Sequence, residues 1–68
     1  MIISVNGELR DLPPPVRLSD VLDLPPGTPT PRGIAVAVDG AVVPRSEHPT
    51  TELADGARVE IVTAVQGG

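Results

Sequence analysis

The last two residues, Gly67 and Gly68, place an unhindered carboxylate after an apolar segment. Glycine has no Cβ, so both residues can be extended or adopt positive φ, and so thin a backbone fits a narrow channel in another protein. A carboxylate becomes an acyl donor once it is activated, most commonly by attack on the α-phosphate of ATP to give an acyl-adenylate. The Gly68 carboxylate is therefore the first candidate reactive group.

A glycine pair at a chain end has a plainer explanation as well. Because glycine makes up about 7% of residues, two terminal glycines arise by chance in roughly one chain in 200. An inert tail thus stays open as an alternative to a reactive one.

The residues before the glycines favour a strand that ends close to the tail. β-Branched residues continue from Arg58 to Val65, whereas chain ends commonly fray. We expect this segment to be fixed in a sheet and only the Gly-Gly tail to be flexible.

Composition excludes several classes of site. There is no cysteine and a single histidine, so neither disulfides nor a zinc site is expected. The chain has no aromatic residue, no lysine and a formal net charge of -4, which argues against nucleic acid as a partner. No nucleophile–base pair or phosphate-binding glycine loop is present, so we expect no catalysis by the isolated chain and no tightly bound cofactor.

The length of 68 residues predicts a single domain, spanning 1–68. Residues 1–5 lack the features of a signal peptide, and the apolar run from Ile34 to Val38 is too short to cross a bilayer. We expect a cytoplasmic protein without a membrane partner.

The first half of the chain predicts a hairpin followed by a short helix. Residues 1–5 and 8–12 alternate as strands around Asn6-Gly7, a strong turn signal, and three prolines end the second strand. Ser19 is the predicted N-cap of a helix that ends near Leu24. The proline-rich segment 24–32 is predicted to be a surface connection.

The second half predicts strands separated by turns. Residues 34–38 and 41–43 flank Asp39-Gly40, residues 45–49 form a polar excursion, and residues 50–53 form a short edge strand. After the turn at Asp55-Gly56, residues 58–65 form a strand whose apolar residues on both faces near Ile61 favour a central position.

These elements predict an α+β fold, a roll in which one main short helix packs across a mixed sheet of four or five strands. A right-handed crossover would place strand 34–38 parallel to a member of the hairpin. The predicted core contains only aliphatic side chains. Its members are Ile3, Val5, Leu9, Leu18, Val21, Leu22, Ile34, Val36, Val38, Val43, Leu53, Val59 and Ile61.

The second half also resembles a known family. The segments AVAVDG, VVPR, LADG and VEIV and the terminal GG occur in the order and near the spacing of the sulfur carriers of thiamin biosynthesis, the ThiS family. Those proteins have the ubiquitin-like β-grasp fold. The first half of the chain matches only in outline.

The resemblance implies a protein co-substrate rather than an enzyme. In the family, an E1-like adenylyltransferase (ThiF-like) consumes ATP to adenylate the terminal glycine, and sulfur from a cysteine desulfurase converts it to a thiocarboxylate. The thiocarboxylate then supplies sulfur to thiazole synthase (ThiG-like). Carried onto this chain, Gly68 bears the sulfur, while Gly67 and Gln66 are recognised in the tail.

Several positions depart from the family pattern. His48 stands where many members have a bulky aromatic residue, and we expect it to alter a surface contact. Ala57 replaces a common aspartate, and Gln66 replaces a frequent third glycine. Arg45, in the VVPR segment, is a possible contact for a partner carboxylate or simply a solvated turn residue.

Three other functions remain open from the sequence. A sulfur carrier of another pathway, such as the small subunit of molybdopterin synthase, shares the tail, although residues 63–66 lack the aromatic and prolines common there. A ubiquitin-like modifier would be joined to lysine through Gly68. An inert β-grasp interaction module would keep its function without Gly67 and Gly68.

Overall fold

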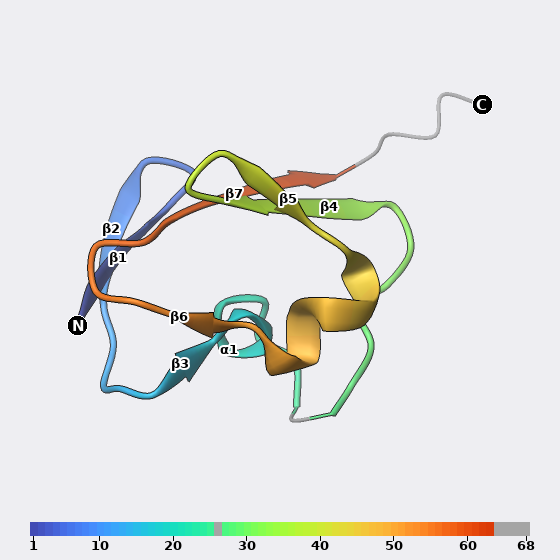
Figure 1. The fold of residues 1–68 in the computed structure, drawn as a ribbon, viewed down its shortest axis with the longest axis horizontal. Helices are drawn as coiled ribbons and strands as arrows, with labels where there is room; N and C mark the ends of the chain where they lie inside the picture. The colour runs from blue at the N-terminus through green and yellow to red at the C-terminus, as the bar shows by residue number, and fades with distance from the viewer. Residues whose placement is uncertain (26, 64–68) are drawn as a thin grey trace.

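A computed structural model describes residues 1–25 and 27–63 of the chain. They form two layers, with a five-stranded sheet on one side and two short helices and a two-stranded sheet on the other (Figure 1). The buried apolar side chains lie between the layers, as expected for an α+β roll.

The larger sheet is mixed. Its strands, in spatial order, are β2 (Glu8–Asp11), β1 (Ile2–Val5), β7 (Arg58–Thr63), β4 (Ile34–Val38) and β5 (Ala41–Val43). Only β1 and β7 pair in parallel, and the other neighbours are antiparallel. The predicted central position of the last strand is confirmed.

The predicted crossover places the wrong strand beside the hairpin. β4 does not adjoin β1 or β2, because β7 lies between β1 and β4 and pairs with both. β7 has apolar residues on both faces, Ile61 and Val62, which suit a strand with neighbours on each side.

The two predicted hairpin turns are confirmed by their backbone. Asn6 and Gly7 have φ of 51° and 84°, and Asp39 and Gly40 have φ of 50° and 84°. Two successive positive φ values give the turn whose twist matches that of the flanking strands, and glycine adopts them without steric cost.

The helix differs from its prediction at both ends. Helix α1 spans Leu18–Val21, so Ser19 lies inside it, buried, and Arg17 is the N-cap residue. The Asp20 carboxylate accepts a hydrogen bond from the Arg17 amide at 2.8 Å, which satisfies the start of the helix. The helix stops before Leu24 because Asp23 adopts a left-handed φ of 56° and Pro25 follows.

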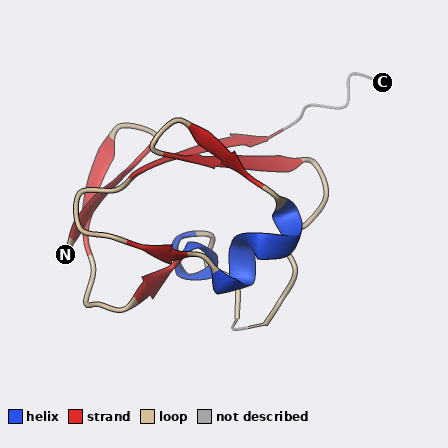
Figure 2. Cartoon of the chain, in the orientation of Figure 1, coloured by secondary structure: helices blue, strands red, loops and turns tan. Residues whose placement is uncertain are grey.

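The second layer contains an element that the sequence did not predict. The 3-10 helix η1 (Arg45–Thr50) covers residues 45–49, expected as a polar excursion, and Thr50, expected at the start of the edge strand. The predicted edge strand is shorter, β6 (Glu52–Leu53), and pairs with β3 (Val16–Arg17) rather than with the larger sheet. Figure 2 shows both helices facing the same side of the larger sheet.

Most of the predicted core is confirmed, with one error and several omissions. Leu9 is 74% exposed, because it lies opposite Ser4 on the face of the sheet that the second layer does not cover. Val16 and Ala57 are buried although neither was predicted to be. The core is not purely aliphatic either, since Thr30 and His48 are buried in it.

No helix among the residues that the structure describes is long and apolar enough to cross a membrane.

Candidate functional site

The candidate reactive group lies beyond the last described strand. Residues 64–68 fall outside the described residues. They include Gln66, Gly67, Gly68 and the last two residues of the predicted strand 58–65, and β7 is described as Arg58–Thr63. The surroundings of the Thr63 end of β7 are therefore the structural basis for the site.

Strand β7 is held firmly up to this end. On one side, Thr63 pairs with Ile34 at the start of β4. On the other, the backbone of Asn6 has already turned away, but its side chain continues the ladder. The Asn6 carboxamide accepts a hydrogen bond from the Ile61 amide at 2.8 Å and donates one to the Ile61 carbonyl at 3.2 Å. The strand that leads to the tail is thus fixed from both sides.

The outer face of the sheet carries an apolar surface next to this end. Cross-strand partners share a face, so the pairs Ala35–Val62 and Ala37–Val42 place four apolar residues together on β7, β4 and β5. Val42 is 76% exposed and Val62 is 63% exposed. We call Ala35, Ala37, Val42 and Val62 the outer apolar patch.

Charged residues border the outer apolar patch on β7. Arg58 and Glu60 lie on the same face as Val62, since residues two apart on a strand point the same way. Their Nε and Oε1 atoms are 3.7 Å apart. An apolar centre with a polar border is the usual composition of a protein-binding surface.

Sequence reasoning missed this patch. It read the apolar residues on both faces of β7 only as a sign of a central position, and the second layer covers only the inner face. The available signal was that only one short helix follows the hairpin, because one helix cannot cover both faces of a sheet.

Arg45, the predicted partner contact, is exposed at the first residue of η1. It follows the end of β5, and Val43 near that end pairs with Val36 on β4. Antiparallel pairing therefore puts Arg45 at the same end of the sheet as Thr63 and the start of the tail.

His48 is buried rather than on the surface, so the expected surface contact is wrong. It is 1% exposed, with its Nδ1 2.6 Å from Thr30 Oγ1 and its Nε2 2.9 Å from the Val43 carbonyl oxygen. The carbonyl can only accept, so Nε2 carries the hydrogen and Nδ1 accepts from the Thr30 hydroxyl. The ring joins η1, β5 and the proline-rich connection, which is a structural role.

The described residues offer no alternative centre for chemistry. They contain no group of three metal-ligating side chains. A shallow groove of about 270 Å³ is lined by Leu12, Pro13, Pro15, Val16 and Asp20. Its single carboxylate, on Asp20, already accepts a hydrogen bond from the Arg17 amide.

Comparison with known proteins agrees with this arrangement. The family model of the ThiS family matches residues 3–68. The chain belongs to the ThiS family. Members of this family are small sulfur carrier proteins of thiamin biosynthesis.

One solved structure gives the fold. The thiamine biosynthesis protein ThiS from Geobacter metallireducens matches over 100% of both chains, with 23% sequence identity and a TM-score of 0.71. The β-grasp fold expected from the sequence is thereby confirmed. A search of curated protein sequences gives no significant match.

Proposed function

We propose that this protein carries sulfur on the carboxylate of Gly68 and delivers it for the thiazole ring of thiamin. The observation that carries the proposal is the ThiS family match, because it extends through residue 68 and so includes both terminal glycines. The chemistry is performed by partner enzymes, and this chain supplies the acyl group.

The first step activates the carboxylate. In an E1-like adenylyltransferase, the Gly68 carboxylate attacks the α-phosphate of ATP, which forms the acyl-adenylate and releases pyrophosphate. ATP is bound by the partner, and no resident cofactor of this chain is required. Gly67 lacks a side chain and lets the backbone enter the narrow active-site channel, while Gln66 is recognised at its entrance.

The second step loads sulfur. A persulfide sulfur from a cysteine desulfurase attacks the acyl carbon, AMP leaves, and reductive cleavage of the resulting acyl disulfide by a thiol leaves the thiocarboxylate on Gly68. Thiazole synthase then takes the sulfur, and the carboxylate is regenerated for another cycle.

The partners need a surface to hold while the tail is in their active sites. The outer apolar patch suits this purpose, since it adjoins the Thr63 end of β7 and is exposed. Burial of exposed valine side chains on a partner would favour binding.

Intact-mass spectrometry tests the proposal. The protein is incubated with ATP, cysteine, a cysteine desulfurase and the ThiF-like enzyme of the same organism. We expect a gain of about 16 Da, oxygen replaced by sulfur, that fragmentation assigns to Gly68. Reactions without ATP, and a variant lacking Gly67 and Gly68, serve as controls and should show no gain.

Two results would count against the proposal. The first is that the mass gain is absent although the adenylyltransferase preparation is active on another carrier protein. This result would exclude the carrier chemistry for this chain. The second is that the thiocarboxylate forms but thiazole synthase makes no thiazole product from it. This result would indicate that the protein serves another sulfur-transfer pathway.

A further inference from the structure

Two arginines lie at the end of the sheet from which the tail departs. Arg32 precedes the start of β4 by two residues, and Arg45 follows the end of β5 by two residues. The start of β4 pairs with the end of β7 through Ile34 and Thr63. The topology therefore places both arginines on the β4–β5 side of β7, at the end of the sheet where Thr63 lies.

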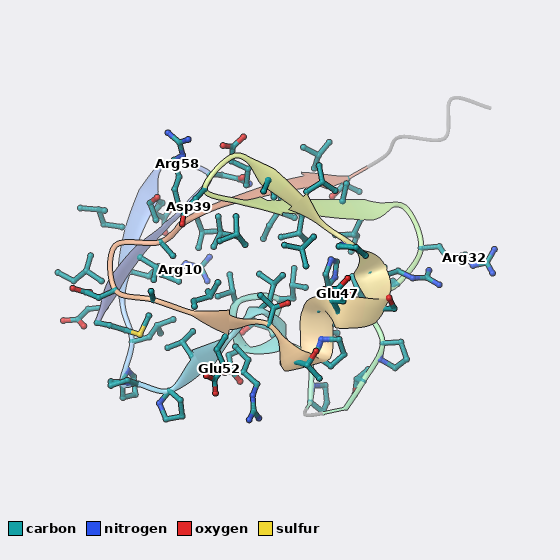
Figure 3. The ribbon with its side chains drawn as sticks, in the orientation of Figure 1. Arg10, Arg32, Asp39, Glu47, Glu52 and Arg58 are labelled. Atoms are coloured by element: carbon teal, nitrogen blue, oxygen red, sulfur yellow. The ribbon has the colours of Figure 1, made fainter. Side chains whose placement is uncertain are left out.

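Both side chains are available to a partner. Arg32 and Arg45 are exposed, and neither forms an ion pair with any residue in 1–25 or 27–63. Arg17 and Arg58, in contrast, are within 4.0 Å of Glu52 and Glu60, respectively. Figure 3 shows Arg32 extending from this end of the molecule, away from the core.

This end carries two exposed arginines on a chain that is acidic as a whole. The chain has a formal net charge of -4. Glu47 is the acidic residue of η1, two residues after Arg45, and it forms no ion pair with Arg32 or Arg45. An acidic molecule with exposed arginines at one end is oriented by the field of an acidic partner, with those arginines first.

We propose that Arg32 and Arg45 bind acidic side chains at the mouth of the adenylating partner's channel. This inference rests on the proposed function. Arginine is the residue best suited to such a contact, because its planar guanidinium donates two parallel hydrogen bonds to one carboxylate. The two contacts would fix the orientation in which the tail enters.

The length of the tail decides against the nucleotide as the anion. Residues 64–68 number five, and five extended residues span at most about 18 Å. A tail extended in a channel carries the Gly68 carboxylate far ahead of the arginines at its base. The triphosphate of ATP is beside that carboxylate, so the arginines meet the rim of the channel instead.

The test compares two variants with the same change in charge. Arg32→Gln/Arg45→Gln removes the proposed contacts. Arg10→Gln/Arg17→Gln removes two positive charges elsewhere, on β2 and β3. ATP–pyrophosphate exchange by the ThiF-like adenylyltransferase of the same organism gives KM and kcat for each carrier, at low and at high salt.

We expect the first variant to raise KM about tenfold at low salt with kcat within twofold of wild type, since rim charges act on association. For the control variant, KM and kcat should both stay within about twofold of wild type. High salt should reduce the difference in KM between the Arg32→Gln/Arg45→Gln variant and wild type. An equal rise in KM for both variants would show that net charge alone matters. An unchanged KM, or a loss confined to kcat, would also overturn the proposal.

Failure of the proposed function would look different. In that case the wild-type chain itself would support no exchange, and neither would any variant, so the proposed contact would fall with the function on which it rests.

Discussion

At the scale of single residues, His48 shows how a polar side chain can be part of a small core. Both ring nitrogens have partners, so its burial leaves no polar atom unsatisfied. Thr30 and Val43 belong to segments on either side of β4 in the sequence. The ring therefore replaces apolar packing with directional links between three segments.

Loss of the Thr30 hydroxyl should be costly. Thr30→Val keeps the shape of the side chain but leaves Nδ1 of His48 buried without a hydrogen bond, so we expect the free energy of unfolding to fall by about 1–3 kcal/mol. Urea denaturation measures this change. Thr28→Val is the matched control in the same connection, and it should cost less than about 0.5 kcal/mol.

A double-mutant cycle separates the hydrogen bond from packing. In a His48→Phe background, Thr30→Val should lower the free energy of unfolding by less than it does in wild type. The reason is that phenylalanine has no ring nitrogen that could lose its hydrogen bond. If the cost of Thr30→Val is the same in both backgrounds, the hydrogen bond contributes nothing beyond shape.

This network could not have been read from the chain. Thr30 and His48 are 18 residues apart, and each is a residue type usually found at the surface. Threonine in a proline-rich stretch and histidine in a polar one both favour loops. Only the folded backbone reveals that they meet. The same holds for Asn6, whose turn was predicted but whose bonds to Ile61 were not.

At the scale of elements, the two faces of the larger sheet have different roles. The inner face packs against the second layer and is structural. The outer face presents valines that contribute little to the core, since Val42 and Val62 are largely exposed. The outer apolar patch should therefore tolerate substitution in the free protein and be sensitive to it in a complex.

Val42→Thr/Val62→Thr tests the outer apolar patch. Threonine keeps the β-branched shape, so we expect little change in unfolding temperature. KM in adenylation should rise about tenfold, as less apolar surface is buried on the partner. Leu9→Thr is the control, being equally exposed on the same face but on β2, two strands from β7. A similar rise in KM for Leu9→Thr would place the contact elsewhere.

Strands were easier to predict than helices in this chain. Alternating valines and isoleucines defined β1, β4 and β7 from local sequence, and the Asn-Gly and Asp-Gly turns placed β2 and β5 beside them. α1 and η1 are short, and their limits depend on tertiary contacts. Leu18 must reach the core, so α1 starts one residue before the predicted cap. The same buried histidine fixes η1 in a segment without helical periodicity.

At the scale of the whole molecule, the single small core limits stability. A domain of 68 residues is expected to have a free energy of unfolding of roughly 3–10 kcal/mol. The core lies between two layers and has no disulfide to support it. A single packing defect in the central strand β7 should therefore remove a large share of the free energy of unfolding.

Val59→Ala tests this dependence on the core. Val59 is fully buried on β7, so the change removes two methyl groups and leaves a cavity, and we expect a loss of about 2–3 kcal/mol by urea denaturation. Val42→Ala makes the same chemical change at an exposed strand position and should cost less than about 1 kcal/mol. Equal losses would mean that strand propensity, rather than burial, dominates.

The overall topology was only partly predictable. The order of elements and the mixed sheet follow from the sequence, but the pairing of β1 with β7 joins the first and last described strands. Local patterns carry no information about such distant partners, so the strand predicted beside the hairpin, 34–38, was the wrong one.

That same pairing has a consequence for how the protein is made. Strands leave the ribosome in sequence order, so hairpin β1–β2 and hairpin β4–β5 both emerge before the strand that joins them. Isolated hairpins are marginally stable in water. A chain whose synthesis stops before β7 therefore has no stable sheet and is open to proteolysis, whereas a folded chain has already completed the strand that leads into the tail. The folded molecules that persist should therefore be those in which synthesis has reached at least β7.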